Sequence, residues 1–203
     1  HSGAFGGEVH RLGREIGQLT AVAIQRARSV EDIRQLADEQ AAMLRVSQTI
    51  GQSLDTVEVF KEITGAGLTL PGFESCQLEL WRPETRQLEI GGTSCIPEWP
   101  GGSPRGTLID GALWPTTLSV IESRQPLIFG ADSPFLTDYE RHVLFINDAT
   151  GTVLIVPIVT GDRCVGTLTY YSRSVNAFHD RHIRVGLYLA NLAALSIERA
   201  RVH

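Results

Sequence analysis

Two histidines and three cysteines are the side chains in this sequence that most readily do chemistry. His179 and His182 stand three positions apart at the start of an expected helix, a spacing that can hold a metal ion, but no set of acidic partners completes it. Cys76, Cys95 and Cys164 lie far apart and form neither a CxxC pair nor a Cys/His cluster. We therefore expect no metal site and no disulfide framework, only exposed polar histidines and passive thiols.

The sequence carries none of the common catalytic motifs. It holds no G-x-S-x-G, P-loop or Rossmann fingerprint, and its Ser, His and Asp residues form no recognisable triad. The net charge of −5, from 23 acidic and 18 basic residues, argues against nucleic acid or an anionic membrane as the main partner. No apolar run approaches the roughly 20 residues of a membrane span, and no signal peptide begins the chain. We expect a cytoplasmic location and no membrane segment within these residues.

The two ends of the chain are copies of one another. Segment 4–28 and segment 177–201 are identical at 10 of 25 aligned positions, including the Ala-Phe start and the Arg-Ala-Arg end. Such a repeat indicates tandem units. We expect residues 1–28 to be the exit helix of a preceding domain and residues 29–54 to form a coiled-coil-like connector with an entry helix. Residues 55–203 then form one whole domain that includes its closing helix.

A seven-residue repeat runs through the first fifty residues in two rows, three positions apart, which is typical of a two-stranded coiled coil. A continuous helix from Val9 to Gly51 would be roughly 65 Å long. The alternative is a break near Ser29, because the residues that follow it resemble a capping box. The seam is weak, since Arg26 and Gln40 occupy core positions. Together with the equivalent rows of the closing helix, the predicted dimer seam consists of Val9, Leu12, Ile16, Leu19, Ala23, Val30, Ile33, Leu44, Val185, Leu189 and Leu192.

The remaining sequence predicts an α+β fold, because its strands come as adjacent pairs rather than alternating with crossover helices. Capping-box patterns open helices at Asp55 and Thr137. Expected helices cover 55–70, 115–122, 137–147 and 180–201. Expected strands cover 76–81, 87–90, 126–129, 152–159 and 165–171, and residues 91–113 form a long loop rich in glycine and proline.

From about Leu44 to Arg201 the chain resembles a GAF domain. The resemblance rests on the order of four pieces: LRVSQTIGQSLD, SRQPLIFGAD, TVLIVPIVTGDRCVGTLTYYSR, and NAF before the closing helix. It implies an antiparallel sheet of five to six strands flanked by helices and preceded by a long N-terminal helix. It also implies a parent protein of the multidomain sensor and signal-transduction type.

The same resemblance implies a pocket between the sheet, the short helices and the long loop. Carried over by position, its ligand-binding residues are Gln77, Glu79, Trp99, Trp114, Phe129, Asp132, His142 and Thr169. His142 is the candidate axial ligand of a haem. The chain lacks the Cys-His dipeptide of bilin-carrying relatives and the Asn-Lys and Asp-Glu signature of cyclic-nucleotide-binding ones, so the cofactor stays unassigned. The pocket is either an apolar cavity with a few polar anchors or a cleft filled by side chains.

Three functions follow from this comparison. The first is a sensory module that binds an unidentified small molecule and relays its state through dimeric helices to an output domain, such as a histidine kinase or a cyclase. The second is a structural homodimerisation module with a filled pocket. The third is an enzyme similar to the free methionine sulfoxide reductases, with Cys95 as its thiol. We expect the first and assign no catalytic residue to this chain.

Overall fold

The computed structural model describes residues 20–31, 56–69, 71–99, 101–145 and 150–202, together with positions 17, 33, 34, 37, 40, 41, 44 and 48. The chain divides into two compact units, His1–Ala41 and Ala42–His203. None of the described helices is long and apolar enough to cross a membrane.

In the first unit, residues 20–31 form one helix. It passes through Ser29, whose Oγ donates a hydrogen bond to the carbonyl oxygen of Gln25 at 3.0 Å. The alternative of a break at Ser29 is therefore wrong, because this side chain bonds back into its own helix instead of capping a new one. The predicted seam positions Val9, Leu12, Ile16 and Leu19 lie outside the described residues.

The second unit is built on one six-stranded antiparallel sheet with the order β3-β2-β1-β6-β5-β4. This confirms the predicted α+β class. The strands are β1 (Ser75–Arg82), β2 (Gln87–Cys95), β3 (Leu108–Asp110), β4 (Leu127–Phe129), β5 (Thr152–Thr160) and β6 (Arg163–Ser172).

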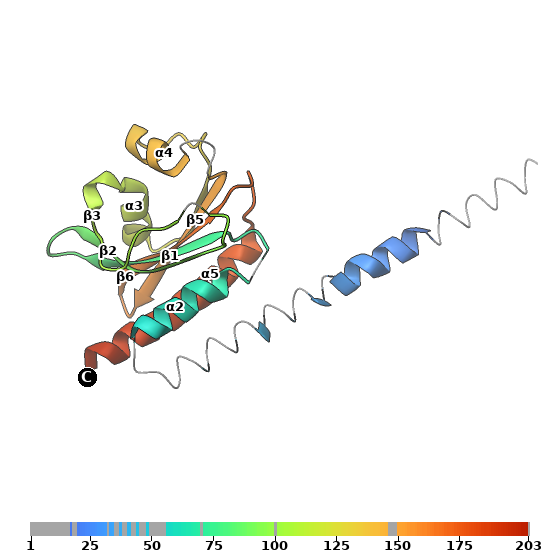
Figure 1. Ribbon diagram of the computed structural model, residues 1–203, viewed down its shortest axis with the longest axis horizontal. Helices are drawn as coiled ribbons and strands as arrows, with labels where there is room; N and C mark the ends of the chain where they lie inside the picture. Colours follow the sequence, from blue (N-terminus) through green and yellow to red (C-terminus); the bar gives the residue numbers. More distant parts are fainter. Residues whose placement is uncertain are drawn as a thin grey trace, which may run out of the picture. The chain divides into compact units, whose positions relative to one another are not determined.

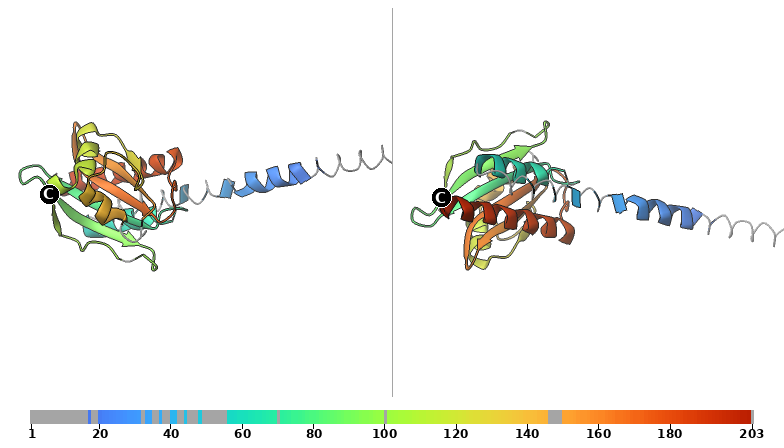
Figure 2. Two further views of the ribbon diagram at one scale, coloured as in Figure 1. Left: turned by 90° about the horizontal axis from the view of Figure 1, so that it is seen from above. Right: turned by 90° about the horizontal axis from the view of Figure 1, so that it is seen from below.

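Helices cover both faces of this sheet (Figures 1 and 2). On one face, α2 (Thr56–Gly67) and α5 (Asp180–Val202) lie side by side. On the other face lie α3 (Pro115–Ser123) and α4 (Asp138–Phe145), with the short 3-10 helix η1 (Gly111–Leu113) leading into α3. The sheet therefore separates two apolar cores, a large one under α2 and α5 and a smaller one under α3 and α4.

The segment 91–113 differs from the expected loop. β2 continues through Gly91 to Cys95, and the segment later adds β3 and η1. Gly91 belongs in the strand because side chains of β1 and α2 approach it closely: a Cβ there would lie 2.6 Å from the Leu78 side chain and 3.2 Å from that of Phe60. Here glycine marks close packing rather than a turn.

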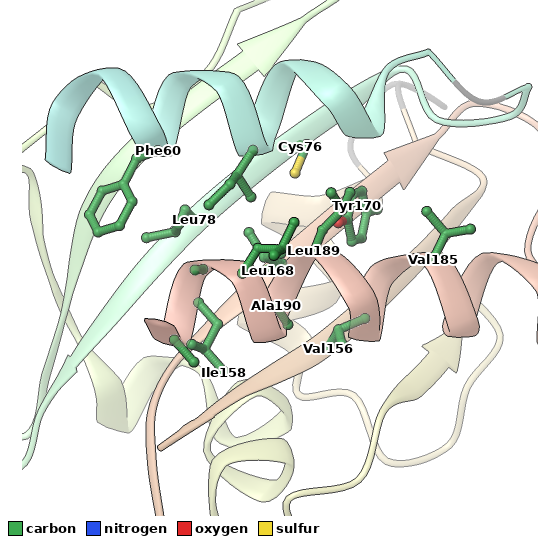
Figure 3. Packing of buried hydrophobic residues seen from close by; sticks show 14 of the residues in the cluster. Phe60, Cys76, Leu78, Val156, Ile158, Leu168, Tyr170, Val185, Leu189 and Ala190 are labelled. Atoms are coloured by element: carbon green, nitrogen blue, oxygen red, sulfur yellow. The ribbon is translucent and has the colours of Figure 1, made fainter. Parts of the chain in front are cut away.

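The large core corrects the seam predicted on the closing helix. Figure 3 shows Leu189 of α5 close to Leu168 and Tyr170 of the sheet, and Val185 belongs to the same buried cluster. Both are buried, as is Leu192. α5 contacts the sheet on one side and α2 on another, so its apolar rows are used within the chain. These three residues are core residues, and a dimer contact on α5 has to use other positions.

One buried carboxylate holds α3 and α4 in place over the sheet. Glu140 Oε1 accepts from the backbone N–H of Thr116 at 2.8 Å, at the start of α3. Glu140 Oε2 accepts from the backbone N–H and the hydroxyl of Thr137, at 3.1 and 3.0 Å. The Thr137 hydroxyl accepts in turn from the Glu140 N–H at 3.1 Å, which confirms the predicted capping box. The positive ends of two helices thus meet at a single side chain.

We expect Glu140→Gln to destabilise the domain by about 1–3 kcal/mol, because an amide NH2 group would replace one of two oxygens that face fixed backbone donors. Thermal and urea unfolding of the purified chain measure this loss. The control is Glu122→Gln, an exposed position at the end of α3, which should change stability by less than about 0.5 kcal/mol. Equal unfolding midpoints for the two variants would show that the Glu140 carboxylate does not hold the helices.

Candidate functional site

The face of the sheet under α3 and α4 carries a buried polar network. In the antiparallel pairing of β1 with β6, Glu79 lies opposite Thr167 and Gln77 lies opposite Thr169, so all four side chains share one face. Glu79 Oε2 accepts from the Thr167 hydroxyl at 2.5 Å and from the Thr169 hydroxyl at 2.7 Å. Glu79 Oε1 accepts from Gln77 Nε2 at 2.9 Å.

Glu79 is a carboxyl group with no basic partner in this network, and only 6% of its surface is exposed. Burial raises the pKa of Glu79 above its usual range, and the hydrogen bonds from Thr167, Gln77 and Thr169 oppose that shift without cancelling it. The group is kept at a cost to the fold, which is common where a side chain serves binding or catalysis.

Above this network lies a cavity of about 30 Å³, which we call the inner chamber. It has room for a water molecule or a small functional group. One wall is the sheet. The other walls come from the start of α3, from α4 and from the segment before α3. Its polar or aromatic lining residues are Gln77, Glu79, Trp114, Thr116, Thr117, Phe129, Glu140, Thr169 and Tyr171.

Two residues that line the inner chamber each carry a buried polar atom without a hydrogen-bond partner among the described residues: Nε1 of Trp114 and Oγ1 of Thr116. Thr116 is only 4% exposed. The Trp114 N–H can only donate, whereas the Thr116 hydroxyl can donate and accept. A buried polar atom left without a partner costs about 1–3 kcal/mol, so the chamber is prepared for a hydrogen-bonding occupant.

A second cavity of about 290 Å³, the outer groove, adjoins the inner chamber. Gln77, Ile109, Trp114, Leu144 and Tyr171 line both. The outer groove adds Trp99 and the glycine pair Gly101-Gly102 to this lining, and none of its described lining residues is charged.

Trp99 is fixed at the outer groove by its neighbours. Its ring centroid lies 6.0 Å from that of Tyr171, and the guanidinium of Arg173 lies 5.5 Å over the ring. Arg173 also donates to the carbonyl oxygen of Glu98. The loop after β2 is therefore tied to the end of β6 by a cation–π contact and a hydrogen bond.

The structure brings together most of the residues that the sequence analysis assigned to a pocket. Gln77, Glu79, Trp114, Phe129 and Thr169 line the inner chamber, and Trp99 lines the outer groove.

Two assigned residues lie elsewhere. Asp132 borders a separate hollow of about 650 Å³ beyond Phe129. His142 is exposed on α4 and belongs to none of these three cavities, which removes it as an axial haem ligand inside them. Two positions along a helix rotate a side chain to roughly the opposite face, so Glu140 takes the inward position and His142 the outward one.

Sequence reasoning missed Thr116 and Glu140. Glu140 was identified only as a capping residue, and Thr116 only as part of a helix start. The signal that was available is the order Pro-Thr-Thr, in which Pro115 opens α3 and two hydroxyl residues follow at once on its first turn.

His179 and His182 make hydrogen bonds at the start of α5. His182 Nδ1 accepts from the His179 N–H at 3.1 Å, and His182 Nε2 lies 3.2 Å from the carbonyl oxygen of Pro71. Among the described residues, no group of three or more His, Cys, Asp or Glu side chains can hold a metal ion.

The three cysteines are free and stay apart. Cys76 pairs with Ser94 across the sheet, while Cys95 pairs with Ser75, so these two thiols point to opposite faces. Cys164 lies at the other end of the sheet, opposite Val159. No two of these three thiols are therefore placed to form a disulfide with each other.

Comparison with known proteins agrees with the topology. The family model described as GAF domain matches residues 53–198. No curated protein matches the chain. Among solved structures, residues 122 to 287 of a methyl-accepting chemotaxis protein align with a TM-score of 0.65 at 18% identity, covering 80% of this chain and 99% of that one.

Two further structures show how widely this fold is used. The GAF domain of a two-component sensor histidine kinase from Bacillus halodurans aligns with a TM-score of 0.60 at 18% identity, covering 74% of this chain and 98% of that one. Free methionine-R-sulfoxide reductase from Neisseria meningitidis, in complex with its substrate, aligns with a TM-score of 0.63 at 14% identity, covering 82% and 92%. At these identities the structures establish the shared fold alone. The family match covers well over half of the sequence, and the chain belongs to the GAF domain family.

Proposed function

We propose that this GAF domain is a sensory module that binds a small molecule between the sheet and helices α3 and α4, and that it signals to an output domain. The observation that carries the proposal is that two residues lining the inner chamber hold buried polar atoms, Trp114 Nε1 and Thr116 Oγ1, with no hydrogen-bond partner among the described residues. A pocket filled only for structural reasons gains nothing from such atoms, because apolar side chains of the same size would stabilise the fold more.

Binding, rather than catalysis, fits the chemistry of this site. The titratable side chains among its described lining residues are two carboxylates and one phenol, and the network around Glu79 fixes that carboxylate with three donors. Cys95, the thiol of the reductase-type alternative, is exposed at the end of β2 and does not line the inner chamber or the outer groove. The proposal therefore assigns no catalytic residue.

Relay to an output domain is proposed to use a parallel pair of N-terminal helices from two copies of the chain. Val30 and Ile33 are each 66% exposed, and Leu44 is 62% exposed. All three occupy the heptad rows of the predicted seam. A second copy that presents the same rows is the self-complementary partner for such a stripe.

The ligand site is tested by thermal unfolding of the chain against a library of nucleotides, amino acids and other small metabolites. A true ligand at a hundred times its Kd adds about 2.7 kcal/mol, which raises Tm by several degrees in a saturable way. Leu144→Trp, which places a larger ring in the wall shared by both cavities, should abolish that shift. The matched control, Leu195→Trp on the outer side of α5, should retain it. If no compound stabilises the wild-type chain, the sensory proposal fails and the alternative, a structural homodimerisation module with a filled pocket, takes its place.

The seam is tested by a pair of matched substitutions. Ile33→Glu puts a charge into the predicted seam and should convert a dimer to a monomer, as measured by analytical ultracentrifugation of the 203-residue chain. Ile24→Glu makes the same change at a position that is 50% exposed but outside both heptad rows, and should leave the dimer intact. A dimer that survives both substitutions, or a wild-type chain that is a monomer, contradicts this route for the signal.

The charge of the site predicts a pH dependence. Because the pKa of Glu79 is raised by burial, the folded state holds a proton that the unfolded chain releases above pH of about 4.5. Stability should therefore fall as pH rises from that value through the folded pKa. Glu79→Gln removes the titration, and its amide can be accommodated because hydroxyl donors rotate to accept.

Unfolding midpoints of Glu79→Gln and wild type between pH 4 and 8 should show the variant gaining relative stability as pH increases. Glu84→Gln, in the exposed turn after β1, serves as the control and should follow the wild-type profile. If the stability of Glu79→Gln and of wild type changed with pH in the same way, burial would not raise the pKa of Glu79.

A further inference from the structure

The charges around the two cavities restrict what can bind there. Within the part of the chain that the structure describes, Glu79 and Glu140 are the only charged side chains that line the inner chamber, and none lines the outer groove. None of the described Lys, Arg or His residues lines either cavity. Arg173, which lies near the groove, uses its guanidinium on the Trp99 ring and the Glu98 carbonyl oxygen. A phosphate or carboxylate ligand would enter a buried space beside two carboxyl groups without a counter-charge, which is strongly unfavourable.

The inner chamber offers both an unused hydrogen-bond donor and unused acceptors. Trp114 Nε1 needs an acceptor, and the Thr116 hydroxyl can serve either way. Oε1 of Glu79 accepts one hydrogen bond, from Gln77, and Oε1 of Glu140 accepts one, from Thr116 N. A carboxylate oxygen can accept two, so each has capacity for a further donor. The complementary group must therefore accept and donate at once.

Size divides the ligand into two parts. The inner chamber, at about 30 Å³, admits only a small head group. The outer groove, at about 290 Å³, has room for a ring-sized body and is flanked by the aromatic side chains of Trp99, Trp114 and Tyr171. Because Trp114 and Tyr171 line both spaces, one molecule can occupy the two together.

We propose that this site selects an uncharged, planar molecule whose head is a carboxamide or an equivalent lactam edge. The carbonyl oxygen accepts from Trp114 Nε1–H, the N–H donates toward the chamber carboxyls, and the ring lies in the outer groove. This inference rests on the sensory function proposed above and names its ligand class. A cation would satisfy the carboxyls but leave the Trp114 N–H without an acceptor, and an anion would do the reverse.

Three phenyl probes of similar size and different charge test this class: benzamide, benzoate and benzylamine, each titrated into the full 203-residue chain by ligand-observed NMR. Benzamide should bind saturably, at least about tenfold more tightly than either of the others. Trp114→Phe, which keeps a ring but removes the N–H, should weaken benzamide about five- to tenfold, the usual loss for one neutral hydrogen bond. The matched control, Trp81→Phe, changes a tryptophan that lines neither cavity and should leave binding unchanged.

If Trp114→Phe lowers the unfolding midpoint of the free chain, Thr116→Val is the second variant, because it keeps the size of the side chain and removes the hydroxyl. Benzoate or benzylamine binding as tightly as benzamide overturns the ligand class, and so does the failure of benzamide to bind. These failures remain distinct from failure of the sensory proposal. A library compound that stabilises wild type but not Leu144→Trp keeps the sensory site and rejects only the carboxamide head, whereas the absence of any stabilising compound rejects both.

Discussion

The register of β1 against β6 is the constraint on which the rest of the domain depends. Glu79 stands opposite Thr167 and faces α3 and α4, while Leu78 stands opposite Leu168 and faces α2 and α5. A slip of one residue would exchange the two faces, placing a carboxyl group in the large core and leucines in the inner chamber. Close strand contact helps to fix the register, since a Cβ at Gly166 would lie 2.1 Å from the Glu79 carbonyl oxygen. Core and pocket are thus specified by the same backbone ladder.

Two buried carboxyl groups in one small space have different physical roles, and their donors show which is which. Glu140 faces two backbone N–H groups whose directions are set by α3 and α4, so its removal leaves fixed donors unsatisfied. Glu79 faces two hydroxyls and an amide, and the hydroxyls can reorient when its protonation or its neighbours change. Helices α3 and α4 are therefore held by the fixed hydrogen bonds of Glu140. The sheet side of the inner chamber carries the network around Glu79, whose hydroxyl groups can reorient.

Local patterns predicted most of the elements, and what they left out depends on tertiary packing. Alternation predicted the β1–β2 hairpin, and Thr137 with Glu140 predicted the start of α4. Periodicity shows that a helix face is buried but does not say against what. Leu189 and Leu192 therefore read as a dimer seam although they pack within the domain.

The site was predictable to the same degree. The family resemblance supplied the pocket, and strand alternation separated Gln77, Glu79 and Thr169 from Leu78 and Leu168, because a strand has only two faces. His142 and Asp132 were not placed correctly, because the facing of a short helix and of a loop end depends on how each docks.

If ligand binding is to reach α5, the sheet offers a short physical route. Thr167 and Thr169 bond the Glu79 carboxylate on one face of β6, while Leu168 and Tyr170 belong to the core under α5 on the other. Proximity does not make this route a switch; it becomes one only if α5 has two packings of similar free energy that a ligand stabilises unequally. The close approach of α5 at Gly186, where a Cβ would lie 2.8 Å from Val156, leaves little room for small adjustments and favours discrete shifts of the whole helix.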